Sequence, residues 1–152
     1  MMTSVALVIG IPFVSAAILV LVPGYRMSAA GNVLAMFATF IAGLSLLFVD
    51  RDSGYYFIVD EMNILFIILN TLVGFTTSVF SASYIGHEIE TGKLTPLFVR
   101  FYHAMFLGMM GSMNLALTAN NIGLMWVGLE MATLITVVMV GIYRTPSAIE
   151  AA

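Results

Sequence analysis

Glu130 is the residue of this sequence whose surroundings point most directly to chemistry. It is the ninth residue of the apolar stretch 122–143, within Trp126-Val127-Gly128-Leu129-Glu130. A charge at the centre of a membrane-spanning helix costs at least about 2.5–3.5 kcal/mol, and an isolated carboxylate in hydrocarbon tends to bind a proton instead. Glu130 is therefore expected either to be protonated or to face a cavity or a cationic partner inside a helix bundle.

The chain offers no cation at the depth of Glu130. The five basic residues all stand at the ends of apolar stretches: Arg26, Arg51, Lys93, Arg100 and Arg144. The counter-charge of an ionised Glu130 must then come from residues beyond Ala152 or from another subunit. A carboxyl that gains or loses a proton as a cation approaches can serve as a proton relay. The alternative is a protonated glutamic acid that only hydrogen-bonds a neighbouring helix.

His103 lies about one turn inside the apolar stretch that begins at Phe101. An imidazole titrates near neutral pH, which suits proton entry, although a purely structural histidine is the commoner case. The helix has no second histidine four residues on and no nearby acid, so no metal site is expected. The absence of cysteine excludes iron–sulfur ligation, and no glycine-rich phosphate loop is present, so no cofactor and no catalytic centre are expected.

The composition is that of an integral membrane protein. Of the 152 residues, 61% are apolar and 9% are charged, whereas a soluble domain carries about 25% charged residues. A mean hydropathy of +1.08 leaves no polar shell for a water-soluble enzyme. Five basic residues and a net charge of −3 exclude a nucleic-acid-binding surface.

Charge-free stretches divide the chain into membrane-spanning segments. Such a helix needs about 20 apolar residues, and Ala119-Asn120-Asn121 is the natural turn within the longest stretch. We therefore predict an all-α integral membrane fold, a single transmembrane domain over 1–152, with five helices at about 3–22, 30–49, 61–86, 99–118 and 122–143. Polar residues make the third and fourth helices unusual, and they serve either interhelical hydrogen bonds or a hydrated axis. They include Asn63, Asn70, Ser78, Ser81, Ser112 and Asn114.

Basic residues predict the orientation in the membrane. Four of them fall on one side of a five-helix arrangement and one, Arg51, falls on the other among acidic residues. The positive-inside rule then places the N-terminus outside and the C-terminus in the cytoplasm. The tail 145–152 has the pattern of a helix start, with Thr145 as N-cap and Pro146 next, so we expect a fragment of a longer chain.

The run Asn120–Leu134, with an asparagine turn followed by a helix that carries one central glutamate, resembles the fifth-helix signature of antiporter-like membrane subunits. These subunits occur in respiratory complex I, Mrp antiporters and membrane-bound [NiFe] hydrogenases. Ser112–Leu117 and Ser81–Tyr84 look similar too. The tail 143–152 is most similar to the hydrogenase-4 component F type, found with formate hydrogenlyase-like complexes.

The resemblance implies a proton-translocating subunit of a hydrogenase or quinone-oxidoreductase complex in a prokaryotic inner membrane. It implies that Glu130 pairs with a lysine of a later helix, and this sequence ends before those lysines. A further chain or segment, beside other membrane subunits and the lipid bilayer, would then supply them. Two alternatives remain open: a structural membrane subunit or truncated remnant without transport of its own, and a small transporter that acts as an oligomer.

Overall fold

Five helices account for most of the chain. The computed structural model describes residues 2–48, 52–92, 96–141 and 150. The elements are α1 (Met2–Leu21), α2 (Tyr25–Ser45), the short 3-10 helix η1 (Leu46–Phe48), β1 (Asp52–Ser53), β2 (Ile58–Val59), α3 (Glu61–Glu90), α4 (Pro96–Thr118) and α5 (Ile122–Val140). The five helices expected from the sequence are therefore present, with a two-stranded hairpin added between the second and third; that all five cross the membrane stays a prediction.

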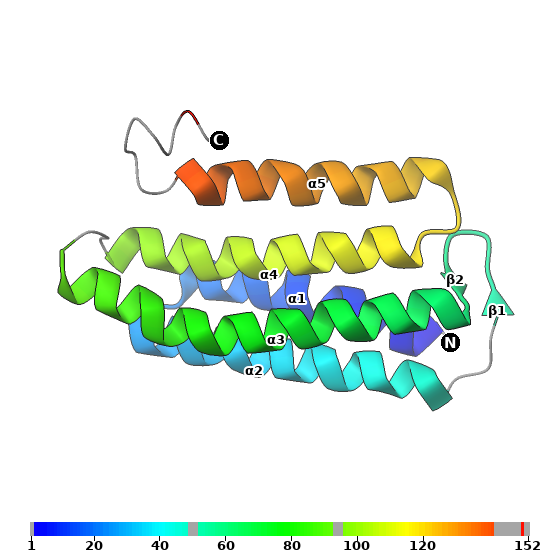
Figure 1. The fold of residues 1–152 in the computed structure, drawn as a ribbon, viewed down its shortest axis with the longest axis horizontal. Helices are drawn as coiled ribbons and strands as arrows, with labels where there is room; N and C mark the ends of the chain where they lie inside the picture. The colour runs from blue at the N-terminus through cyan, green and yellow to red at the C-terminus, as the bar shows by residue number, and fades with distance from the viewer. Residues whose placement is uncertain (1, 49–51, 93–95, 142–149, 151–152) are drawn as a thin grey trace.

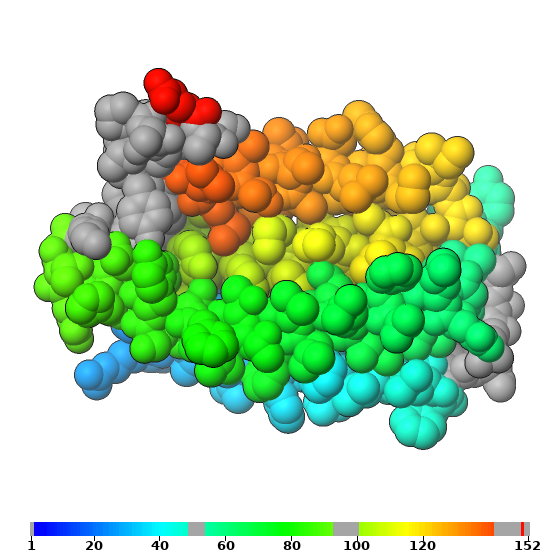
Figure 2. Space-filling view, in the orientation of Figure 1, coloured from blue at the N-terminus to red at the C-terminus, as the bar shows by residue number. Residues whose placement is uncertain are grey.

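The helices run alternately up and down, and α4 lies at the centre (Figure 1). Four of them, α1, α2 with η1, α3 and α5, are each long and apolar enough to cross a membrane. A helix of 20 residues spans about 30 Å, the thickness of the hydrocarbon core. Helix α4 contacts each of the other four helices, whereas α5 lies at the edge of the bundle beside α4. Figure 2 shows α5 as an outer ridge along that edge.

The second helix begins earlier than predicted. It starts at Tyr25 instead of residue 30, so Arg26, expected in a loop, lies in its first turn. Gly24 explains the early start, because its φ of 96° reverses the chain directly after α1 without the steric penalty that a side chain would meet. Helix α3 likewise continues to Glu90, four residues past the predicted end.

The hairpin closes one end of the bundle. β1 and β2 pair antiparallel, and the hairpin reaches across to the α4–α5 turn, where the Asn120 backbone N–H donates to the Tyr56 carbonyl at 2.8 Å. The predicted turn is confirmed, and Asn121 ends it as the residue before α5. It has an extended φ of −145°, and its side chain caps α5 by accepting from the Leu124 N–H at 2.7 Å.

Asp60, one of the acidic residues before the third helix, is the N-cap of α3. Its carboxylate accepts from the Asn63 N–H at 2.8 Å. Lys93, Arg144 and, apart from Glu150, the helix start predicted over 145–152 lie outside the described residues.

A proline in α1 explains a polar contact between α1 and α4. Pro12 has no N–H, so the carbonyl four residues earlier, that of Val8, loses its helical donor. The Asn114 side chain of α4 replaces it, because its Nδ2 donates to the Val8 oxygen at 3.1 Å. Its Oδ1 accepts from Asn70 Nδ2 of α3 at 2.9 Å. A single buried amide thus joins three helices, as the interhelical alternative predicted.

Most serine and threonine residues of α3 and α4, unlike Asn114, hydrogen-bond within their own helix. Thr71, Ser78 and Ser112 donate to carbonyls of their own helix one turn back. Ser81 is an exception, because its hydroxyl lies 2.8 Å from the Tyr102 hydroxyl on α4.

We expect Asn114→Ala to lower the free energy of unfolding by about 1–3 kcal/mol, because it leaves the Val8 carbonyl unsatisfied. In a Pro12→Ala background the restored N–H of residue 12 can donate to the Val8 carbonyl. Asn114→Ala should then cost about 1 kcal/mol less. Thermal unfolding of the four proteins of this cycle in detergent measures the difference. An equal cost in both backgrounds would show that the proline does not explain the contact.

Candidate functional site

Small residues set how α5 meets α4. A Cβ added at Gly128 would lie 2.8 Å from the Ala116 backbone nitrogen and 2.9 Å from the Ser112 carbonyl oxygen. Backbone atoms cannot move aside, so only glycine permits this approach. Ala132 is buried one turn further along the same face. The sequence spacings Gly108-x-x-x-Ser112 and Gly128-x-x-x-Ala132 therefore form a close helix contact of the kind common in membrane bundles.

This contact turns Glu130 away from α4. Glu130 lies midway between Gly128 and Ala132, which at 3.6 residues per turn puts it on the opposite side of α5. The Glu130 side chain is exposed on that face, and so are Trp126 (60% exposed) and Val137 (43%). The bundle formed by the five helices therefore does not enclose the carboxyl group.

The Glu130 carboxylate has no hydrogen bond or ion pair with the part of the chain that the structure describes. The one polar side chain beside it on the same face is Thr133, whose hydroxyl donates to the Leu129 and Glu130 carbonyls of its own helix. No cation is paired with this carboxylate among the side chains that the structure describes, within residues 2–48, 54–92 and 101–141. The expected counter-charge must come from outside these residues.

His103, in contrast to the exposed Glu130, lies inside the bundle. It is completely buried in α4, and its Nδ1 lies 3.1 Å from Asn32 Nδ2 of α2. The ring lies between two tyrosines, with its centroid 5.3 Å from that of Tyr102 and 6.2 Å from that of Tyr25. Glu130 and His103 are therefore not brought into one site: one faces outward from α5 and the other is enclosed among α2 and α4.

Buried polar atoms without partners gather around His103. Four such atoms are found among the described residues, namely His103 Nε2, Asn32 Oδ1, Ser28 Oγ and Tyr25 Oη. Three of the four residues lie on α2 at spacings of three and four, hence on one helix face. Tyr25, Ser28 and Asn32 are not among the site residues predicted from the sequence, although this spacing of polar residues in an apolar helix is a signal that could have found them.

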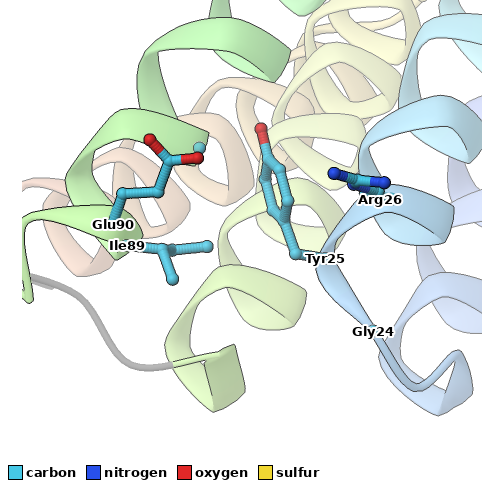
Figure 3. Close-up of a pocket in the computed structure, with 6 residues that line it drawn as sticks. Gly24, Tyr25, Arg26, Ile89 and Glu90 are labelled. Atoms are coloured by element: carbon cyan, nitrogen blue, oxygen red, sulfur yellow. The ribbon is translucent and has the colours of Figure 1, made fainter.

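A surface pocket of about 450 Å³ opens beside this cluster (Figure 3). Gly24 and the first two residues of α2, Tyr25 and Arg26, line it on one side, and Gly86, Ile89 and Glu90 of α3 line it on the other. Tyr25 belongs to both places, because its ring lines the pocket while its hydroxyl is buried without a partner. The described residues contain no group of three histidine or acidic side chains that could hold a metal ion.

The comparisons with known proteins identify what this chain is similar to. No family model matches the sequence. Over 97% of its length it is 52% identical to the hydrogenase-4 component F homolog of Methylacidiphilum infernorum. The expected likeness to hydrogenase-4 component F is confirmed. The chain spans 31% of the length of that hydrogenase-4 component F homolog.

We expect Gly128→Ala to separate α5 from α4, because the new methyl group would overlap backbone atoms. Overpacking of this kind costs about 1–3 kcal/mol, so the melting temperature should fall. Gly123→Ala is the matched control on the same helix, since an added Cβ there meets only the Asn121 side chain at 3.4 Å. Equal melting temperatures for the two variants would contradict the close contact.

Proposed function

We propose that this chain is the N-terminal part of a proton-translocating, antiporter-like membrane subunit of a hydrogenase or quinone-oxidoreductase complex. Its relative is named a hydrogenase-4 component, and its helices are long and apolar enough for a membrane. Electron transfer belongs to other subunits, because the sequence has no cysteine to hold an iron–sulfur cluster.

The observation that carries the proposal is the placement of Glu130. Its carboxylate stands in the middle of a 19-residue apolar helix, on a face that no described residue covers. Intramembrane acids normally face a bundle interior or a water-filled cavity, because contact with lipid is costly. The outer face of α5 is therefore where a further segment of the protein, or a neighbouring subunit, packs.

Glu130 exchanges a proton under the control of that neighbour. When a lysine approaches, its positive charge stabilises the ionised carboxylate and the proton leaves. When the lysine withdraws or becomes neutral, the carboxylate binds a proton again, since a bare charge in a low-dielectric environment is unfavourable. The Gly128 contact keeps the carboxyl group directed outward, toward the incoming partner, throughout this cycle.

His103 is a second proton-exchanging group of the proposal. It lies in α4, the helix that α5 packs against, and it is buried among polar side chains of α2. Its place near one end of the bundle suits transfer between the aqueous phase and the membrane interior.

The same proposal includes a cell location and an orientation. The protein is a multi-pass component of a prokaryotic inner membrane, with the N-terminus outside and the C-terminus in the cytoplasm. Arg26 lies at one end of the bundle, whereas Asp60 and Glu61 begin α3 at the other end. This charge distribution supports a cytoplasmic position for the Arg26 end.

A structural role without transport is the second candidate. It is favoured by the absence of any cation beside Glu130 in the described chain. In that case Glu130 stays protonated and donates a hydrogen bond to the neighbour that covers α5.

The Glu130→Gln variant separates the two functions, because glutamine keeps the size and hydrogen bonding but cannot release a proton. In the assembled complex, reconstituted in vesicles, we expect at least about tenfold slower proton translocation at unchanged subunit composition. Thr133→Val is the control on the same face and should translocate normally. Normal translocation by Glu130→Gln would reject the relay and favour the structural role.

A further inference from the structure

We propose that the four unpartnered polar atoms around His103 enclose a bound water cluster, which opens to the aqueous phase through the Tyr25–Glu90 pocket. The inference rests on the proposed function only in its last step, the use of this water to carry protons. The site itself follows from burial and hydrogen-bonding capacity.

The polar atoms around His103 need partners that the described chain does not provide. His103, Asn32 and Ser28 are fully buried, and each has a side-chain atom without a hydrogen bond. Buried polar groups are satisfied by protein or by ordered water in nearly every case, and a buried water typically makes about three hydrogen bonds. Four neighbouring polar atoms can hold such waters.

The need for water does not depend on how the Asn32 amide is oriented. With Nδ2 donating to His103 Nδ1, the ring proton sits on Nε2 and has no acceptor, while Asn32 Oδ1 has no donor. With the amide reversed, Oδ1 accepts from Nδ1–H, and then Nε2 lacks a donor and Nδ2 lacks an acceptor. Both orientations leave Nε2 and one amide atom unpartnered.

The contrast with Thr39 shows that this clustering is local. Thr39 is also fully buried on α2, and eleven residues, or about three turns, put it on the same face as Ser28. Its hydroxyl donates to the Ala35 carbonyl at 2.8 Å. The unsatisfied atoms are therefore confined to the end of the bundle that carries the pocket.

Tyr25 connects the pocket to the cluster. Figure 3 shows the Tyr25 ring between Glu90 and Arg26 at the pocket. A Cβ added at Gly86 would lie 2.9 Å from the Tyr25 hydroxyl oxygen, so a larger residue at 86 would displace that hydroxyl. Glycine at this position thus leaves room for the tyrosine hydroxyl against α3, beside the pocket.

A proton arriving through this water can bind at the imidazole with both ring N–H groups hydrogen-bonded. Protonation of the neutral ring makes both nitrogens donors. The Asn32 amide then presents Oδ1 to Nδ1–H, while Nε2–H donates to a water. The proton leaves again by the reverse rotation, so the amide orientation follows the charge of His103.

Cysteine accessibility tests the water cluster directly, because the chain has no cysteine of its own. In the assembled complex, Ser28→Cys is treated with 2-aminoethyl methanethiosulfonate, and the mass of this chain reports the reaction. Since this reagent attacks the thiolate, which forms in water, we expect Ser28→Cys to react at least about tenfold faster than the equally buried Thr39→Cys. Equal rates at positions 28 and 39 would overturn the proposal.

Radiolytic labelling of the unaltered complex gives a second measurement that needs no variant. Hydroxyl radicals formed from bound water should oxidise His103 more than Met110, a more oxidisable residue that is 3% exposed on the same helix. Preferential oxidation of Met110 would show that the His103 site is dry.

The two proposals fail separately. Fast labelling at position 28 with normal translocation by Glu130→Gln keeps the water cluster and rejects the relay. Slow labelling with a Glu130→Gln defect keeps the relay and rejects the water cluster.

Discussion

A polar atom placed in hydrocarbon loses the hydrogen bonds of water, and lipid offers none in return. The interior of this bundle is arranged around that constraint. The carbonyl freed by Pro12 receives a donor from Asn114, and the first turns of α3 and α5 receive caps from Asp60 and Asn121. Because the amide of Asn114 also accepts from Asn70, one side chain ties together α1, α3 and α4.

Among the described residues, polar groups around His103 and at Glu130 lack hydrogen-bond partners, and the two places differ. Around His103 the unpartnered atoms are buried inside the bundle, which suits enclosed water. At Glu130 the carboxyl group faces outward from α5, which suits a partner from another segment. The α4–α5 contact at Gly128 links them, because it fixes the outer helix on the helix that carries His103. In the two proposals, water brings protons to the His103 site and a cation from another segment controls the proton on Glu130.

Much of the fold could be predicted because the sequence divides clearly into long charge-free apolar stretches and short polar connections. Charge-free stretches identified all five helices, and the asparagines at 120 and 121 identified the last turn. The start of α2 was misplaced, since Arg26 was assigned to a loop although Gly24 had already turned the chain. The face of Glu130 could not be predicted, because α5 is apolar on all sides and small residues at Gly128 and Ala132 decide which side packs. The hydrogen bond from Asn114 to the Val8 carbonyl freed by Pro12 could not be predicted either, because the two residues are 106 positions apart in the sequence.

The central claim is that another segment brings a cation to the outer face of α5. A structure of the complete assembled protein, with side chains resolved, tests it through the distance from the Glu130 carboxylate oxygens to the nearest basic nitrogen. We expect a lysine nitrogen within about 4 Å, or one bridging water away. Lipid acyl chains against Glu130, with no polar group beside it, would contradict the account.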